Sequence, residues 1–523
     1  MLAALAPDDS ADGMFADLPA KPAEAAECLA GYLWTVLGDP EHGARWRAAH
    51  CVRLLAELGC KEELDALQRF ALGTLDVTPF HDARLPFYDR HALQWLLFAL
   101  ARAAQNTATH QGLVEFEPLL RKVLFDDGPH VVMQESAKAI CLALASSGYG
   151  SLTADELDIV RSVNSPKKGV SQSWAELRAR ELNDTDEGSL AREPSDFRFD
   201  WDFKDRWCRP LAEAFGVSKE TVLRLAGHTI TANWQLAYRG VHEDDPRYSL
   251  KLYREGSTFA HHTTWPDADD LDFYLSTHAL WTVAGELLKT HPVYRDSEAD
   301  TDLFTDWLGA FLLTRDDGRW LADRRDPSPQ SIFRGQYDTP KPDWIWQLNS
   351  QHFSERLLAS DGWVTVWESS DDSSYQAAQQ VLIHSALVTA EKGRALALAL
   401  QTAPSYMAYR IPNADDSDYQ FDTQGFQLTG WIVTPDGCEG QDNRDPLAAR
   451  VRYPPYRPAD KFVGLLGLEP DADMREWTRA DGTVLRSAVW NDTAETTSEH
   501  VTGTKGERLK IRRDALQELL SLT

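Results

Sequence analysis

The sequence predicts a mainly α-helical protein whose C-terminal part is an α+β domain. Apolar residues recur every three to four positions in the N-terminal part, as on one face of an α-helix. Three such stretches begin near prolines, Pro40, Pro86 and Pro129, which lie 46 and 43 residues apart. From about residue 340, β-favouring segments alternate with Asp-Gly turns, a pattern typical of strands.

The proline spacing points to repeated helix pairs. Ala48, Val52 and Leu55 follow Pro40 on one helical face, and Ala137, Cys141 and Leu144 follow Pro129 at the same offsets. After Pro86 come Leu93, Leu97, Leu100 and Ala104. The spacing matches the roughly 40–47 residues of HEAT and armadillo repeats, so residues 21–165 are predicted to form a HEAT-like α-solenoid. An irregular helical bundle with coincidental prolines is the alternative.

Partner helices complete the predicted repeats. Two further apolar stripes mark them, and their members are Leu29, Leu33 and Val36, then Leu64, Leu67 and Ala71.

Composition limits the function classes. The 523 residues suggest about three domains, and 43% hydrophobic residues suffice for real cores. A net charge of −28 repels phosphates, which disfavours nucleic acid as a partner. The six cysteines are scattered and read as reduced thiols. The N-terminus lacks the pattern of a signal peptide, and no apolar run is long enough to cross a membrane, so we expect a cytoplasmic protein.

The rest of the chain divides by composition. Residues 1–20 are predicted to be disordered, 166–196 to be a linker, 197–339 a central helical domain and 340–523 the α+β domain. Alternating aromatics from Phe197 to Phe203 indicate a short strand or an aromatic clamp. Residues 211–226 resemble a helix-turn-helix with Gly216 in the turn and Ser218 as N-cap. A clear helix is predicted over 267–290.

The predicted α+β domain has three strand segments: DGWVTVWESS, FQLTGWIVTPDGC and TVLRSAVWND. A helix is expected to bury Ala395, Leu398 and Ala399. RDALQELLSL closes the chain as a helix, which suggests a fragment of a longer protein. Trp344, Trp346, Trp363, Trp367 and Trp431 fit a protein-binding surface or packing between domains equally well.

One polar constellation is a candidate metal site. It consists of His261, His262, Asp269, Asp270 and His278, because imidazole and carboxylate groups ligate divalent metals. Capping and hydrogen bonding is the competing role, since His278 lies two helical turns or more beyond the aspartates.

A second polar group is Asp323, Arg324, Arg325 and Asp326, which could bind an anion or form ion pairs between domains. The sequence has no P-loop, nucleophile elbow or zinc motif, so it favours a non-enzymatic protein and predicts no cofactor.

Several runs resemble a known family: RWRAAHCVRLLAELG, FHDARLPFYDRHALQWLLFALARAA, FRFDWDFKDRWCRPLAEAFGV, DGRWLADRRDPSP and SALVTAEKGRALALALQTA. They look like the C-terminal, HEAT-like sensor half of bacterial STAND or NACHT-like NTPases, several of which act in antiphage defence. The resemblance implies a sensor or scaffold region. That family's effector and P-loop NTPase parts have no counterpart here, so its ATPase residues match nothing.

Three functions remain open at this point. The first is a recognition module for a protein partner, offered by the concave face of stacked repeats. The second is a metal-dependent hydrolase that uses the His261–His278 region. The third is a structural subunit of a larger assembly.

Overall fold

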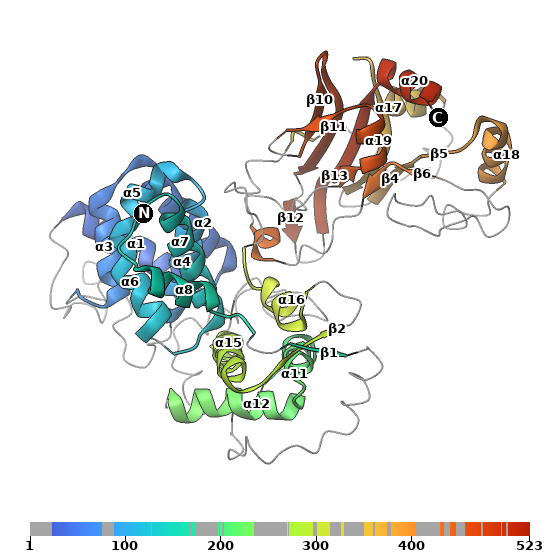
Figure 1. Ribbon diagram of the computed structural model, residues 1–523. Helices are drawn as coiled ribbons and strands as arrows, with labels where there is room; N and C mark the ends of the chain where they lie inside the picture. The colour runs from blue at the N-terminus through green and yellow to red at the C-terminus, as the bar shows by residue number, and fades with distance from the viewer. Residues whose placement is uncertain are drawn as a thin grey trace. The chain divides into compact units, whose positions relative to one another are not determined.

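The computed structural model describes residues 24–75, 88–126, 128–166, 169–172, 197, 199–200, 203–234, 269, 271–296, 301–313, 326–328, 350–358, 361–373, 378–402, 429–433, 440–445, 456–471, 474–492, 494–497 and 500–522. The chain divides into two compact units, residues 1–318 and 319–523 (Figure 1). The described part of the first unit is almost entirely helical, and that of the second contains an antiparallel sheet. The predicted mainly helical fold with a C-terminal sheet is thus confirmed.

Helices of the N-terminal region come first along the chain. They are α1 (Ala25–Leu37), α2 (His42–Leu58), α3 (Lys61–Leu72), α4 (Tyr88–Ala103), η3 (Thr107–Thr109), α5 (His110–Leu113), η4 (Val114–Phe116), α6 (Glu117–Arg121), η5 (Lys122–Asp126), α7 (Val131–Ser146) and α8 (Ala154–Ser162).

These helices pack in two rows. The predicted inner helices α2, α4 and α7 lie side by side, and α1, α3 and α6 form the second row (Figure 1). Val52 and Ala137 are fully buried, as their spacing predicts. The predicted inward position of Leu29 is wrong. Leu29 is 42% exposed, because α1 turns Ala26, Ala30 and Leu33 inward instead. The assignment of these rows as a HEAT-like solenoid stays a prediction.

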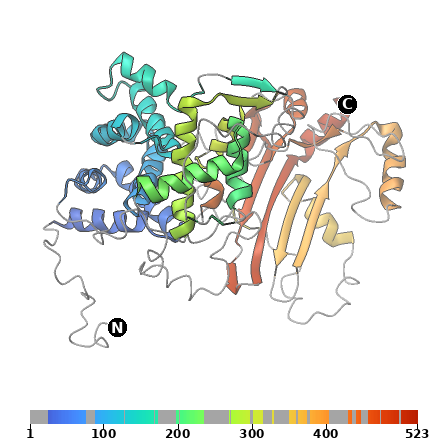
Figure 2. The same ribbon diagram turned by 90° about the horizontal axis from the view of Figure 1, so that it is seen from below.

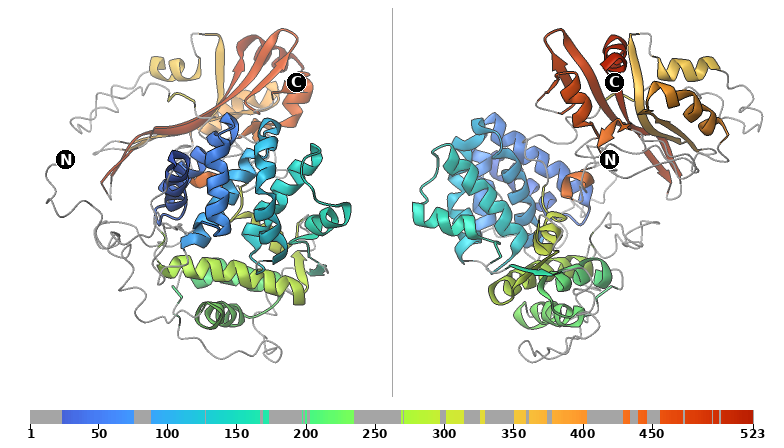
Figure 3. Two further views of the ribbon diagram at one scale, coloured as in Figure 1. Left: turned by 90° about the vertical axis from the view of Figure 1, so that its left-hand side faces the viewer. Right: turned by 45° about the vertical axis from the view of Figure 1, so that its right-hand side comes forward.

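Helix α15 (Leu271–Thr290) lies across the beginnings of the inner row. The left view of Figure 3 shows α15, in yellow-green, running crosswise under the ends of the blue and cyan helices. The main-chain N–H of Asp269 donates to the carbonyl of Pro40 at 2.8 Å. Gly285 packs directly on the turn before α7, since a Cβ there would lie 2.7 Å from the Cβ of Pro129 and overlap its carbonyl oxygen.

The remaining elements of the first unit are η6 (Lys204–Cys208), α11 (Arg209–Phe215), α12 (Lys219–His228), η7 (Thr229–Asn233), α16 (Leu303–Gly309) and the parallel strands β1 (Gly169–Gln172) and β2 (Val293–Asp296). The predicted helix-turn-helix is confirmed: Gly216 adopts φ 61° after α11, and Ser218 caps α12. Phe197, Phe199 and Phe203 are buried against one another, as an aromatic clamp.

Strand β1 lies inside the segment predicted as a linker, which corrects that prediction for residues 169–172. Its four residues pair with β2, from Gly169 opposite Val293 to Gln172 opposite Asp296.

The second unit contains α17 (Ser350–Leu357), β3 (Trp363–Ser373), β4 (Ala378–His384), β5 (Ala386–Leu387), α18 (Ala390–Gln401), β6 (Thr429–Gly430), β7 (Ile432–Val433), η10 (Gln441–Arg444), β8 (Arg457–Pro458), α19 (Asp460–Leu465), β9 (Glu469–Pro470), β10 (Glu476–Arg479), β11 (Gly482–Asn491), β12 (Ala494–Thr497), β13 (His500–Arg512) and α20 (Arg513–Leu522). Its main sheet has the order β4-β3-β13-β11-β10-β9, with β12 also paired to β13 (Figure 2).

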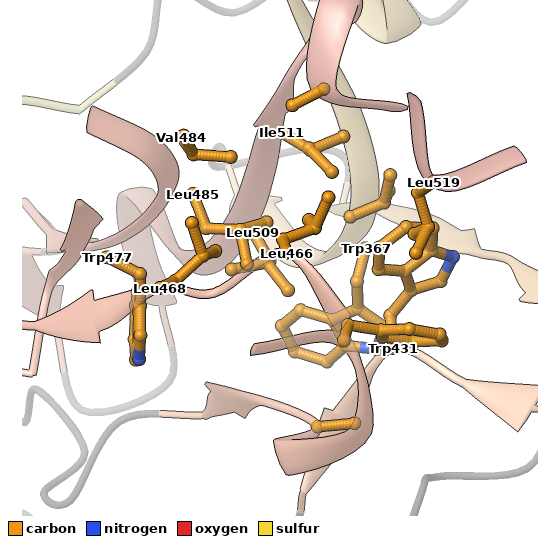
Figure 4. Packing of buried hydrophobic residues seen from close by; sticks show 14 of the residues in the cluster. Trp367, Trp431, Leu466, Leu468, Trp477, Val484, Leu485, Leu509, Ile511 and Leu519 are labelled. Atoms are coloured by element: carbon orange, nitrogen blue, oxygen red, sulfur yellow. The ribbon is translucent and has the colours of Figure 1, made fainter. Parts of the chain in front are cut away.

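The two faces of this sheet differ in chemistry. Helices α19 and α20 supply Phe462 and Leu519 to an apolar core that includes Trp367 and Trp431 (Figure 4). These two tryptophans therefore pack inside one unit, whereas Trp344 and Trp346 lie outside the described residues. On the other face, β3 places Glu368 next to Arg356 of α17.

Helix α18 corrects a predicted apolar face. Leu396 and Ala399 are buried, but Leu398 is 54% exposed and Ala395 is exposed as well. None of the described helices has the length and apolar composition needed to cross a membrane.

We predict that Gly285→Ala destabilises the first unit by about 1–3 kcal/mol, because the new Cβ meets main-chain atoms of Pro129 that cannot move aside. Thermal unfolding followed by circular dichroism measures the loss. Gly309→Ala is the matched control: nothing lies within 4 Å of its Cβ position, so unchanged or slightly higher stability is expected. Equal effects of the two substitutions would contradict this account of the α15 contact.

Candidate functional site

Two members of the predicted metal set, Asp269 and His278, lie in the described part of the chain. Asp269 precedes α15, and His278 is on its second turn; their side chains are 7% and 0% exposed. His261, His262 and Asp270 lie outside the described residues. Asp269 and His278 do not meet directly, because His91 of α4 lies between them.

The buried polar groups form a linear chain. Arg45 Nη2 lies 2.9 Å from Asp269 Oδ2, and His91 Nε2 lies 3.2 Å from the same oxygen. His91 Nδ1 is 3.0 Å from His278 Nε2, and His278 Nδ1 is 3.0 Å from His130 Nε2. His130 caps α7, with its Nδ1 accepting from the N–H of Met133 at 3.3 Å. We call Arg45, Asp269, His91, His278 and His130 the histidine chain.

The direction of hydrogen bonding is fixed at the His130 end of the histidine chain. The Met133 N–H can only donate, so His130 accepts through Nδ1 and carries its proton on Nε2. His130 therefore donates to His278, which donates to His91. At the other end His91 Nε2 lies 3.2 Å from Asp269 Oδ2, and the carboxylate charge favours a proton on that nitrogen. These contacts fit an assignment in which all three histidines are neutral.

Electrostatics support the neutral assignment. Burial lowers the pKa of His130 from its ordinary value of 6.5 to about 3, and the charge of Arg90 acts in the same direction. Burial also lowers the pKa of His278 well below its ordinary range, with His130 and His91 adding to the effect. An imidazolium would also face the positive ends of the helices that begin here.

Arg45 supplies the compensating charge for Asp269. The Arg45 side chain is 2% exposed, and its Nη1 donates to the carbonyls of Asp39 and Pro40 at 2.7 and 2.8 Å. Burial lowers the pKa of Arg45, while the Asp269 carboxylate acts in the opposite direction. The ion pair joins the first turns of α2 to the segment just before α15.

This arrangement suits docking of α15 more than metal binding. A ligating histidine must offer a lone pair to the metal, but the ring nitrogens of His278 are both engaged with other histidines. Within the described residues, no group of three or more His, Cys, Asp or Glu side chains could hold a metal ion. The capping and hydrogen-bonding alternative describes Asp269 and His278 well.

The second predicted group is represented by Asp326 alone, because Asp323, Arg324 and Arg325 lie outside the described residues. Asp326 pairs with Arg475, and its N–H donates to the carbonyl of Val489 at 2.7 Å. Its Oδ2 accepts from the N–H of Val489 at 2.9 Å. All three residues belong to the second unit, so Asp326 fastens its own segment to β11.

One further titratable cluster lies in the second unit. Glu368 is fully buried, bound by Arg356 and by Arg508 Nε at 2.8 Å. Burial opposes its ionisation, but the two arginines outweigh this and lower the pKa of Glu368. Arg508 also lies 5.2 Å from the centroid of the Trp490 ring. The cluster holds α17 on the sheet and presents no reactive group.

Sequence reasoning missed His91 and His130. A signal was present: Arg45 and His91 both stand five residues after the repeat prolines Pro40 and Pro86, and His130 follows Pro129 directly. The polar residues at the start of each inner helix could therefore have been predicted to lie close together.

No protein family model matches this chain, and no curated protein matches it either. The function therefore has to be argued from the residues and their geometry.

We predict that acid weakens the docking of α15. Unfolded histidines take up protons below pH about 6.5, whereas native His130 stays neutral until pH about 3. Stability is thus fully present above pH 6.5 and falls as the pH falls, by roughly 1.4 kcal/mol per pH unit for each histidine held neutral.

Hydrogen exchange of α15 peptides at pH 7.5 and pH 5.5, corrected for the intrinsic exchange rate, measures this loss of protection. His130→Asn keeps an N-capping side chain and removes one titrating group. In this variant the protection of α15 against hydrogen exchange should depend less steeply on pH. The same pH dependence in both proteins would show that His130 does not contribute.

We also predict that Asp269→Asn costs about 3–5 kcal/mol, because it leaves the buried Arg45 without a counter-charge. Arg45→Met combined with Asp269→Asn should recover part of the loss, since no charge is then buried alone. Chemical denaturation of the two variants tests this, and a double variant less stable than the single one would refute the ion-pair account.

Proposed function

We propose that this chain is a non-enzymatic recognition module that binds a protein partner through exposed apolar side chains of α1 and α2. One observation carries the proposal: α1 and α2 expose large apolar side chains. Leu29 and Tyr32 of α1 are 42% and 66% exposed, and Leu54 and Leu58 of α2 are 47% and 76% exposed. We call these four residues the end patch.

Single exposed apolar side chains are ordinary, but the end patch lies on two helices that pack against each other. Four large apolar side chains on one helix pair expose more apolar surface than scattered single residues do. An apolar outer surface at this position favours a partner that covers it.

The chemistry of the end patch indicates a protein partner. Tyr32 is an aromatic side chain of the kind that dominates binding energy at protein interfaces. Arg47 of α2 is 56% exposed and adds a positive charge to the same helix. Apolar and charged side chains occur together in such interfaces.

The sequence also suggests a biological setting. We propose that the two rows are a HEAT-like solenoid and that the chain is a cytoplasmic sensor part of a bacterial antiphage defence system. The runs that resemble the sensor half of STAND-type proteins support this proposal. The partner would then be a protein of the infecting phage or another component of the same system.

We predict that Tyr32→Ser with Leu58→Ser abolishes partner capture and leaves folding intact, because both side chains are exposed. A photo-crosslinking residue at position 32, used in infected and uninfected cells, identifies the protein that contacts the patch. Leu520→Ser with Leu522→Ser on α20 is the matched control, since these leucines are 57% and 56% exposed.

Two results would count against the proposal. Crosslinks that join only copies of this chain, together with a dimer in light scattering, would assign the end patch to self-association. Equal capture by the end-patch variant and the α20 variant would place the partner elsewhere.

A further inference from the structure

A pocket of about 350 Å³ lies within the first unit, between the two helical rows. Its lining comes from α1, α3, α4, η5 and the start of α7. This volume falls in the range of about 300–1,000 Å³ found for small-molecule sites.

Apolar side chains form much of the pocket wall. Phe70 and Leu93 are partly exposed and contribute aromatic and aliphatic surface, whereas Trp34 and Met133 are 2% and 4% exposed. Trp34 is held in place, because its Nε1–H donates to Asp89 Oδ1 at 3.2 Å. Phe70 thus offers aromatic surface for a flat ring.

The charges of the pocket favour an anion. Arg90 and Lys122 line it, and among the described lining residues one carboxyl group, that of Asp89, opposes them. Burial raises the pKa of Asp89, which weakens its opposition to a bound anion. The start of α7 also lines the pocket at Gly128 and His130, and the positive end of a helix attracts negative charge. This positive lining stands out in a chain with a net charge of −28.

Among the described residues, Lys122 makes no hydrogen bond or ion pair, and its side chain is half-buried. Arg90, in contrast, also lies 5.1 Å from the centroid of the Trp234 ring. Lys122 is therefore placed to meet a ligand in the pocket.

We propose that this pocket binds a small organic anion with a flat apolar ring. The acidic group would lie near Lys122 and Arg90, and the ring would contact Phe70 and Leu93. This site is separate from the end patch, so either proposal can fail without the other.

A matched pair of fluorescent probes tests the proposal. Anilinonaphthalene sulfonate carries a sulfonate on an aromatic system, and phenylnaphthylamine is its uncharged relative. We expect the anion to bind with one-to-one stoichiometry and more tightly than the neutral probe. Its affinity should fall as salt is added. Equal affinity for the two probes would overturn the anionic assignment.

Variants then locate the binding. Lys122→Met keeps the aliphatic stem of the side chain. It should lower the affinity for the anionic probe roughly tenfold and leave the affinity for the neutral probe unchanged. Lys289→Met, at an exposed lysine of α15, is the control and should change neither. Ala71→Phe fills the pocket from α3 and should block both probes. Binding of the anion that survives both Lys122→Met and Ala71→Phe would place the site elsewhere and refute the proposal.

Discussion

The contact on which the first unit depends is the buried ion pair of Arg45 and Asp269. Two charges are removed from water there, which is costly unless each is fully compensated. Arg45 Nη1 donates to two main-chain carbonyls, and Asp269 Oδ2 contacts Arg45 Nη2 and His91 Nε2, so these contacts offset part of the cost. Because the compensating groups come from α2, α4 and the residue before α15, the low-energy state requires all three to be in place. The three neutral histidines extend the same requirement to α7.

The Arg45–Asp269 ion pair and the three histidines lie at one edge of the helical rows, so the two edges differ in chemistry. At the beginnings of the inner helices, polar side chains and the close approach of Gly285 to Pro129 hold α15. Elsewhere on the rows, α1 and α2 have the exposed apolar side chains of the end patch. The pocket between the rows includes His130, the last member of the histidine chain, in its lining. A ligand in that pocket would therefore contact the group that links α7 to α15.

Local patterns predicted elements well, and long-range assembly poorly. Apolar spacing located α2 and α7, and Ser218 located the start of α12, because these signals lie within one or two turns. Strand β1 was missed because four residues are stabilised only by pairing with β2, far along the chain. The histidine chain was missed for the same reason: His278 meets His91 and His130 across 187 and 148 residues. Leu398 was placed inward because both faces of α18 carry leucines, so the sequence does not distinguish them.

The histidine chain also shows why residue type alone separates metal sites from hydrogen-bonded networks poorly. Imidazole and carboxylate groups serve both, and the difference lies in where the lone pairs point. A metal needs several lone pairs directed at one point. Here both ring nitrogens of His130 and of His278 are engaged in hydrogen bonds, and the main-chain N–H of Met133 sets their direction. The donors and acceptors therefore follow one another in a line, so their lone pairs do not converge on one point.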